Sequence, residues 1–175
     1  MGRIINRLSK GNIRRCSILI LILCGTQKQQ FTRMISTVEK IANQHEIIVQ
    51  AGHTEYTSPK MQIFDFITAD EIAILYERAD YIITHGGAGS MFQAVTAGKK
   101  TLVVPRLAKY EEHVDNHQLQ LAEKLAKLGY LQVFHDGDDI EMVFADLQNF
   151  TPKQYHLNGE IPALVAKNLR KWLIK

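Results

Sequence analysis

Residues 81–104 of the chain read YIITHGGAGSMFQAVTAGKKTLVV, and this stretch decides the fold. An apolar run at 81–84 leads into a glycine-rich turn. Residues 91–97 then have the spacing of a short helix, which ends at Gly98, a typical C-terminal cap. A second apolar run follows at 101–104. Strand, helix and strand in this order predict a βαβ unit, in which the two strands are parallel.

The same alternation extends in both directions from this unit. Residues 17–24 (SILILILC) are continuously apolar, as a central parallel strand covered on both faces requires. The other elements are predicted from their apolar spacing. We expect helices at 31–43, 69–78, 116–128, 138–147 and 160–174, and strands at 46–50, 62–66 and 131–134. The sequence therefore predicts an α/β protein with a doubly wound, mostly parallel sheet.

Length and composition are typical of one soluble globular domain. A chain of 175 residues is long enough for one core, and 46% hydrophobic with 22% charged residues is average for this class. We interpret residues 1–16 as a basic N-terminal arm and residues 17–175 as a single domain. No change of composition inside that domain indicates a linker.

Positive charge is concentrated at the N-terminus. Residues 1–16 carry five basic side chains and no acid, whereas the remaining 159 residues carry 16 basic and 18 acidic groups. The nearly neutral body argues against nucleic-acid binding, which needs positive charge spread over a folded face. The arm is compatible with contact to an anionic membrane surface, and a solvated terminus explains it equally well. The apolar run at 17–24 is too short to span a bilayer.

Cys16 and Cys24 flank this apolar run. In an extended strand they would lie about 26 Å apart at ~3.3 Å per residue, which is too far for a disulfide bond. No cluster of Cys and His has the spacing of a zinc site. Both cysteines are therefore predicted to be free thiols in a reducing cytoplasm.

The turn after the strand at 81–84 is predicted to bind a phosphate group. The sequence THGGAGS at 84–90 has three glycines in four residues, and these lack the Cβ atoms that would keep a ligand from the backbone. Ser90 is predicted to cap the helix, whose free N–H groups and dipole favour an anion. The alternative is a tight turn that needs glycine for its own geometry. Walker A and dinucleotide motifs both fail, because Gln93 replaces a required glycine and none follows Gly89 at the right spacing.

Two further loops are predicted at the same edge, because ligands of such sheets bind beyond the carboxyl ends of the strands. Residues 25–27 (GTQ) offer a hydroxyl and an amide to a second ligand group, or form a plain turn. Residues 111–118 (EEHVDNHQ) crowd hydrogen-bonding side chains around one helix start, where Asp115 or Asn116 is enough as a cap. The excess suits a polyhydroxylated ligand such as a sugar.

One acidic motif is interpreted differently. Asp136-Gly137-Asp138 superficially matches the Asp-x-Asp that holds a metal–nucleotide complex in one glycosyltransferase class. It lies between the last strand and a helix, so Asp138 is predicted to be an N-cap in a glycine turn.

Two blocks carry a resemblance to a known family. ADYIITHGGAGSMFQAVTAGKKTLVVPR (79–106) and EHVDNHQLQLAEKLAKLGY (112–130) resemble the glycosyltransferase family 28 C-terminal domain, and the resemblance covers most of residues 17–133. It is especially close to short, stand-alone members. These are the soluble subunits of bacterial exopolysaccharide and capsule glycosyltransferases and the cytosolic subunit of the eukaryotic dolichol-linked N-acetylglucosamine transferase. The resemblance implies a Rossmann-like GT-B C-terminal half-domain that binds a UDP-sugar donor and needs no metal or other cofactor.

The resemblance also implies an activity and partners. The expected function is that of a hexosyltransferase subunit in polysaccharide biosynthesis, which transfers a hexose from a UDP-sugar to a lipid-linked saccharide acceptor. A GT-B enzyme closes two domains around its substrates, so a membrane-anchored partner is expected to supply the acceptor half. The chain would then lie in the cytoplasm, peripheral at the inner face of the membrane. The helix at 160–174 either docks on that partner or packs on its own domain.

Site residues follow from the matching motifs. His85 corresponds to a residue near the donor phosphates and is the one catalytic candidate; no general base is identified. His117 and Gln118 fall where relatives have an acid–amide pair on the donor sugar. The predicted donor-binding residues are Gly25, Thr26, Gln27, His85, Gly86, Gly87, Ala88, Gly89, Ser90, Gln93, Glu112, Asn116, His117 and Gln118.

One departure from the family keeps a second function open. Gln93 stands where relatives usually carry a glutamate that holds the ribose hydroxyls. An amide makes a weaker hydrogen bond than a carboxylate, by about twofold. A non-catalytic nucleotide-sugar-binding or scaffolding subunit is therefore the alternative. An epimerase of the same architecture is disfavoured, because it would normally need both domains.

Overall fold

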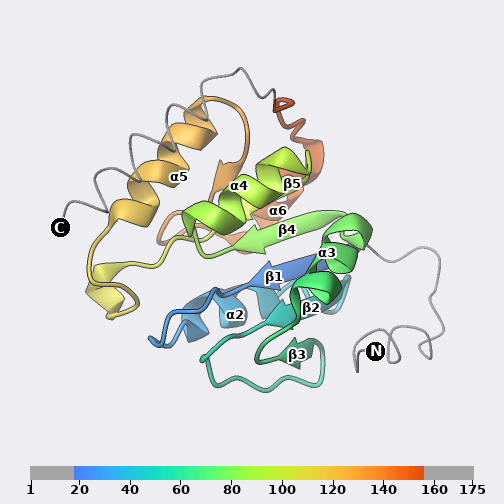
Figure 1. Ribbon diagram of the computed structural model, residues 1–175, viewed down its shortest axis with the longest axis vertical. Coiled ribbons are helices and arrows are strands. Elements are labelled where there is room, and N and C mark those ends of the chain that lie inside the picture. The colour runs from blue at the N-terminus through green and yellow to red at the C-terminus, as the bar shows by residue number, and fades with distance from the viewer. Residues whose placement is uncertain (1–17, 156–175) are drawn as a thin grey trace.

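A six-stranded parallel sheet with helices on both faces forms the centre of the computed structural model, which describes residues 18–155 (Figure 1). The strand order is β3-β2-β1-β4-β5-β6, and every strand pair is parallel. The described elements are β1 (Leu19–Leu23), α2 (Thr32–Glu39), β2 (Glu46–Gln50), β3 (Gln62–Phe64), α3 (Ala69–Arg78), β4 (Tyr81–Thr84), α4 (Ala88–Thr96), β5 (Lys100–Val103), the 3-10 helix η1 (Ala108–Tyr110), α5 (His117–Lys127), β6 (Gln132–Val133) and α6 (Ile140–Asn149). The predicted doubly wound α/β sheet is confirmed.

Strand β1 explains why both faces are covered. Its side chains alternate between the two faces, and every residue of the strand is buried. Ile20 and Ile22 belong to the core that includes the buried faces of α2 and α6. Leu21 and its neighbours on the other face pack with α3 and α4, and α5 extends that layer over β5. An uninterrupted apolar run is what such a two-sided position needs.

The start of α4 differs from the prediction. The helix begins at Ala88 with Gly87 in the N-cap position, and no side chain caps it. Ser90 was predicted to be the cap, and this is wrong: it lies inside the first turn. The reason is the backbone of the two preceding glycines. Gly86 has a φ of +85° and Gly87 is extended, so the chain turns sharply and the helix starts at once.

Two other caps were assigned to the wrong residue or role. Asp139, not Asp138, caps α6, since its Oδ1 accepts from the Glu141 N–H at 2.8 Å. Asp138 instead closes the preceding turn by accepting from the His135 N–H at 2.7 Å. Asn116 occupies the N-cap position of α5, but its Oδ1 accepts from the Ala108 N–H at 3.1 Å. Asn116 therefore has the expected position but a different partner, whereas Asp138 lies one residue before the cap.

Several predictions lie outside residues 18–155: the basic arm at 1–16, Cys16 and the helix at 160–174. Cys24 is a buried free thiol, and burial raises its pKa to about 12. Within the described range, no helix combines the length and the apolar character needed to cross a bilayer.

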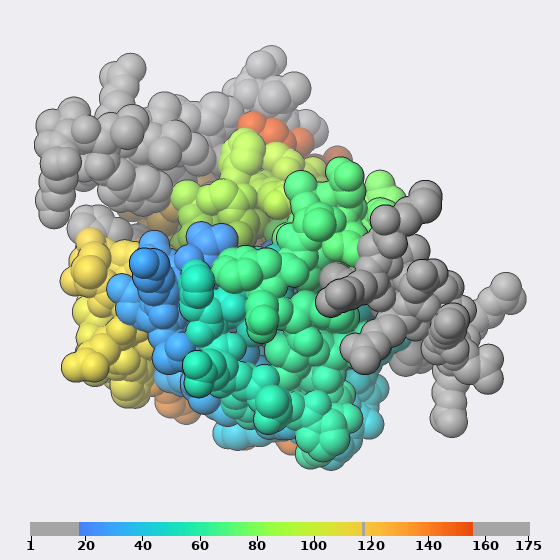
Figure 2. Space-filling model, turned by 60° about the horizontal axis from the view of Figure 1, so that its bottom comes forward, coloured from blue at the N-terminus to red at the C-terminus, as the bar shows by residue number. Residues whose placement is uncertain are grey.

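The parallel strands bring their carboxyl ends to one edge of the sheet. In Figure 1 the arrowheads of β1 and β4 point the same way, and the loops that follow β1, β4 and β5 lie side by side there. Figure 2 shows the loop after β1, in blue, against the yellow segment that precedes α5. A hydrogen bond of 2.9 Å from Arg106 to the Gln29 carbonyl joins these two loops.

Candidate functional site

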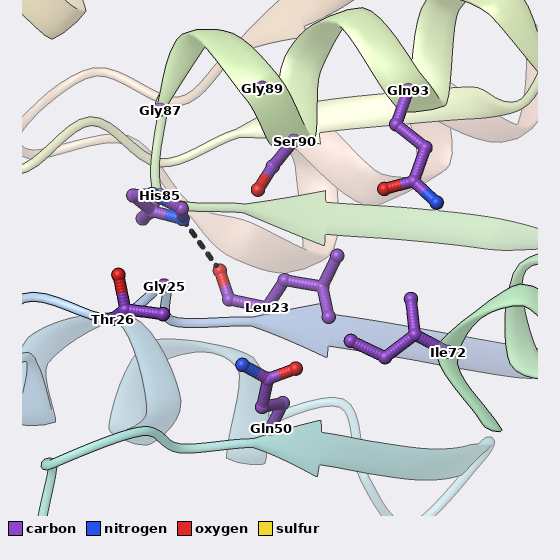
Figure 3. A pocket seen from close by; sticks show the side chains of 10 residues that line it. All are labelled: Leu23, Gly25, Thr26, Gln50, Ile72, His85, Gly87, Gly89, Ser90 and Gln93. Atoms are coloured by element: carbon purple, nitrogen blue, oxygen red, sulfur yellow. Dashed lines mark hydrogen bonds between the residues drawn. The ribbon is translucent and has the colours of Figure 1, made fainter. Parts of the chain in front are cut away.

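A cavity of about 280 Å³ opens at this edge, between β1 and β4. Here the strand order reverses direction, because β1-β2-β3 runs one way and β4-β5-β6 the other. Ligands of doubly wound sheets bind at this switch point. Figure 3 shows the lining residues: Leu23, Gly25, Thr26, Gln50, Ile72, His85, Gly87, Gly89, Ser90 and Gln93.

The His85 ring lies between two glycines of the site and is only 7% exposed. A Cβ atom on Gly25 would come within 2.5 Å of the ring Nε2, and one on Gly87 within 2.3 Å. Both contacts are too short for any side chain. These two glycines are therefore needed by the protein itself, to seat the imidazole. At Gly89, by contrast, a Cβ would meet nothing within 4 Å, so this glycine leaves space that a ligand can use.

Hydrogen bonding and burial make His85 neutral in the empty site. Its Nδ1 lies 3.1 Å from the Leu23 carbonyl oxygen, which can only accept, so Nδ1 carries the proton. The second nitrogen, Nε2, is then an acceptor. Burial, with a smaller contribution from the charges of Arg106 and His113, lowers the pKa of His85 to about 4, although the hydrogen bond to Leu23 acts in the opposite direction. His85 was predicted to stabilise negative charge. Because the Nε2 of the neutral ring is an acceptor, His85 can stabilise negative charge only after it takes up a proton. An anionic ligand favours this proton uptake.

Backbone N–H groups that suit an anion are at the start of α4. The N–H groups of Ala88, Gly89 and Ser90 belong to the first turn, where a helix has no internal acceptor for them. The helix dipole adds partial positive charge at the same point. Among the described residues that line the cavity, none is an aspartate or a glutamate that would repel an anion.

Arg106, which the sequence analysis did not single out, holds the loops around the site in place. Its side chain is fully buried, with the guanidinium carbon 4.4 Å from the centre of the Phe31 ring. It donates to the carbonyls of Cys24 at 3.0 Å, Gln29 at 2.9 Å and Glu112 at 3.1 Å. Its charge also lies close enough to His85 to lower the pKa of that residue. A positive charge is thus fixed behind the cavity.

Glu112, which was predicted to bind the donor, does not line the cavity. Its carboxylate is buried and forms a two-point ion pair with Arg33, at 2.9 Å from Nε and 2.7 Å from the terminal nitrogen. The same carboxylate accepts from the Leu107 N–H at 3.0 Å. Glu112 therefore stabilises the loop after β5 and lies outside the cavity.

Several other predicted residues do not line the cavity. Gln118 is next to the site: a Cβ on Gly86 would lie 3.6 Å from its Oε1, and this oxygen is buried with no hydrogen-bond partner in the described structure. His117 is the first residue of α5. The predicted residues that line the cavity are Gly25, Thr26, His85, Gly87, Gly89, Ser90 and Gln93; Gln27, Gly86, Ala88, Asn116 and Gln118 do not.

A comparison of sequence families decides the relationship of this chain. The glycosyltransferase family 28 C-terminal domain matches residues 19–168. The chain belongs to this family. The predicted resemblance is therefore confirmed, over a longer range than the two blocks that first indicated it.

Similar proteins place the GT28 C-terminal domain within larger transferases. The UDP-N-acetylglucosamine--N-acetylmuramyl-(pentapeptide) pyrophosphoryl-undecaprenol N-acetylglucosamine transferase of Wigglesworthia glossinidia brevipalpis is 30% identical over 132 residues, which are 68% of this chain and 35% of that protein. The UDP-N-acetylglucosamine transferase subunit ALG13 of Yarrowia lipolytica is 34% identical over 85 residues, 49% of this chain and 41% of that protein. The chain thus spans about two fifths, or less, of the length of these relatives.

Solved structures support the fold. The calicheamicin glycosyltransferase CalG4 superposes with a TM-score of 0.59 at 15% identity, over 79% of this chain and 36% of that protein. The predicted Rossmann-like, GT-B C-terminal half is therefore confirmed as the fold of this GT28 domain.

Three lining residues were missed from the sequence of this GT28 domain: Leu23, Gln50 and Ile72. In the sequence, Leu23 and Ile72 have the pattern of ordinary core residues of a strand and a helix. Gln50 offered a signal, because it is a polar residue that ends an apolar strand at the carboxyl edge.

Proposed function

We propose that this chain is the donor-binding part of a glycosyltransferase that transfers N-acetylglucosamine from UDP-N-acetylglucosamine to a lipid-linked acceptor. The observation that carries the proposal is the cavity at the switch point, where helix N–H groups and an unobstructed glycine face a space free of carboxylates. Both similar transferases are named for UDP-N-acetylglucosamine, and one is named for a pyrophosphoryl-undecaprenol acceptor. Their donor supports the choice of hexose.

The chemistry assigned to this chain is stabilisation of the leaving group. As the acceptor hydroxyl attacks the anomeric carbon of the donor, the bond from that carbon to the diphosphate oxygen breaks and charge develops on UDP. The N–H groups at the start of α4 are aimed where this charge develops, which is the usual electrostatic mode of catalysis. His85 takes up a proton from solvent when the anionic donor binds, and its positive charge then also stabilises the leaving UDP. The proton of the acceptor hydroxyl goes to a base outside this chain.

The acceptor half belongs to a partner in this proposal. A membrane-anchored subunit holds the lipid-linked saccharide and recruits this chain to the cytoplasmic face of the membrane. The relative from Yarrowia lipolytica is itself named as a subunit, which supports an enzyme divided between chains. We propose no metal in the transfer step.

The donor site is tested with Gly89→Val. A Cβ at this position meets no atom within 4 Å, so we expect a valine side chain to extend into the cavity beside the α4 N–H groups. We expect at least about a tenfold loss of affinity for UDP and UDP-N-acetylglucosamine in calorimetry, with an unchanged melting temperature. Ala97→Val, at the exposed far end of the same helix, is the matched control and should bind normally. Unchanged affinity in Gly89→Val would remove this site, and failure of the wild type to bind UDP with or without its partner would overturn the function.

A non-catalytic nucleotide-sugar-binding subunit is the second candidate, because Gln93 lines the cavity where relatives carry glutamate. Gln93→Glu separates the two functions. An active enzyme should gain about fivefold in transfer rate per hydrogen bond to the ribose, because a charge-assisted bond is about twice as strong as a neutral one of about 1 kcal/mol. A rise in transfer of about a hundredfold or more would instead indicate a site that has lost its activity.

A further inference from the structure

A second cavity, of about 410 Å³, lies at one end of the sheet and is called the edge cavity below. Residues of α5, of the segment that contains β6 and of α6 line it. In the described part of the chain β6 is the last strand of the sheet and pairs with β5 alone. Among the described residues, none lines both this cavity and the one at the switch point. The proposed donor site therefore gives the edge cavity no role.

The floor of the edge cavity is apolar. Leu131 and Val133 are buried beneath it, and Val143 and Phe150 of α6 line it while only partly buried. Met142, which lies one helical turn before another lining residue of α6, is 70% exposed. Apolar surface that water still reaches favours an occupant with apolar side chains of its own.

The rim of the edge cavity is acidic. Glu123 of α5 and Asp146 of α6 line it from two different helices, and no lysine or arginine is among its described lining residues. His135 also lines it, but its Nε2 lies 2.7 Å from the Glu123 carboxylate. Asp146 has no hydrogen-bond or ion-pair partner in the part of the chain that the structure describes. Carboxylates above an apolar floor suit an occupant that is both cationic and partly apolar.

The basic arm has this chemistry, and the proposed function leaves the arm without a role. Residues 1–16 lie outside the described range, and their sequence contains five basic side chains and no acid. Between these are the apolar residues Ile4, Ile5, Leu8 and Ile13. A second copy of the edge cavity is a poor occupant, because it would bring carboxylates against carboxylates.

The arm is also long enough to reach the edge cavity of its own chain. Ile18, just before β1, packs against the same core cluster as Val143 and Phe150 of the cavity lining. Across the sheet, β1 and β6 are three strand spacings apart, which is roughly 14 Å at ~4.8 Å per strand. Residues 1–16, when extended, span about 50 Å at ~3.3 Å per residue. The distance is therefore well within reach.

We propose that the edge cavity is the docking site of this chain's own basic arm. Basic side chains of the arm pair with Glu123 and Asp146, and its apolar side chains cover the floor beside Val143 and Phe150. A docked arm is not available to an anionic membrane surface, which would compete for the same positive charges. The inference does not depend on the donor site, because the two cavities have separate linings.

Limited digestion of the full-length chain with trypsin tests the docking. Trypsin cuts after lysine and arginine in segments that are free to unfold locally, so a docked arm is protected. We expect arm fragments, followed by mass spectrometry, to be released about fivefold faster from Asp146→Lys than from the wild type, because an attraction becomes a repulsion. Asp146→Asn, which only removes the charge, should give about twofold.

The matched control is Glu77→Lys, which makes the same change of charge at an exposed residue of α3 outside the edge cavity. It should release the arm at the wild-type rate. Equal rates in the wild type, Asp146→Lys and Glu77→Lys would overturn the docking.

Carbodiimide coupling locates the arm, because it joins a carboxylate directly to an amine with loss of water. In the wild type we expect Lys10 to be linked to Asp146 or Glu123, and Lys10→Arg should lose this link. In a mixture of ordinary and ¹⁵N-labelled chains, both linked peptides should carry the same isotope. Links of mixed isotope would overturn docking within one chain.

Binding to phosphatidylserine vesicles tests the competing ligand. Release of the arm should make Asp146→Lys bind these vesicles more tightly than Glu77→Lys, which carries the same net charge. Equal vesicle binding by these two variants would show an arm that is already free for the membrane, and would overturn the inference.

Discussion

At the scale of single residues, the glycines of the site divide into two groups. Gly25 and Gly87 are in contact with the His85 ring and have no room for a Cβ, whereas Gly89 faces open space. A glycine-rich loop next to a cavity is usually attributed to the ligand. Here the side chain of His85 imposes most of that requirement.

This coupling is testable with Gly87→Ala. The new Cβ would lie 2.3 Å from His85 Nε2, so the ring must move. We expect a loss of about 1–3 kcal/mol in the free energy of unfolding, as is usual for overpacking. In a His85→Ala background, Gly87→Ala should lower the free energy of unfolding by only a few tenths of a kcal/mol, because the imidazole ring that the new Cβ would strike is absent. Equal costs in both backgrounds, measured by urea unfolding, would contradict the contact.

Stability should also depend on pH through His85. Its pKa falls from about 6.5 to about 4 on folding, so the unfolded chain takes up the proton first as the pH drops. Stability is therefore complete above pH 6.5 and is lost progressively as the pH falls from 6.5 to 4. The loss is about 3 kcal/mol, at 1.36 kcal/mol per pKa unit. Urea unfolding of wild type and His85→Gln across this range measures it; parallel pH profiles would disprove the assignment.

At the scale of elements, two arginines, one buried and one partly buried, position the loops that surround the cavity. Arg106 ties the loop after β1 to the loop after β5 through backbone carbonyls. Arg33, in α2, pairs with Glu112 and also donates to the Pro105 carbonyl at 2.8 Å. The site therefore depends on charges that lie outside it.

Removal of one member of the Arg33–Glu112 pair should destabilise the fold. The side chains are 20% and 5% exposed, so Arg33→Met leaves a nearly buried carboxylate without its cation. We expect the free energy of unfolding to fall by about 3 kcal/mol, since breaking a buried ion pair typically costs about 3–5 kcal/mol. Arg33→Met with Glu112→Leu should cost less than the sum of the two single changes. Additive costs in a denaturation cycle would show that the pair is not coupled.

The sequence predicted these elements better than their ends. Strands and helices follow from local apolar patterns, and these are dense enough here to give the sheet and its helices. A helix cap depends on which of several neighbouring side chains accepts a hydrogen bond from a free N–H group of the first turn. Ser90, Asp138 and Asn116 do not accept the bond predicted for them. Arg106 bonds to the carbonyls of Cys24 and Gln29, which are distant in sequence, so local patterns do not identify it.

At the scale of the whole molecule, the proposed function gives the domain one side of a reaction. In this proposal the cavity binds the leaving nucleotide, and the acceptor half lies on another chain. Donor binding and transfer should therefore be separable properties.

We expect the isolated chain to bind UDP-N-acetylglucosamine without transferring its sugar. Transfer of radiolabelled N-acetylglucosamine to lipid should begin when the membrane-anchored partner is added, and the partner alone should be inactive. Addition of EDTA should leave the rate unchanged, because no carboxylate among the described cavity residues is placed to hold a metal on the diphosphate. A rate that falls with EDTA and recovers with Mg²⁺ would refute the metal-independent step.

The cavity lining is shared equally between two continuous segments of the chain: five residues precede Ala79 and five follow Asp80. The segments carry three strands each and meet where β1 pairs with β4. A chain cut between Ala79 and Asp80 would give two fragments that must reassociate to rebuild the site. A nucleotide that binds only the rebuilt site pulls the fragments together by mass action. If the proposed donor site is correct, the donor should hold the two fragments together across the middle of the sheet, and the domain should serve as a split reporter that assembles in its presence.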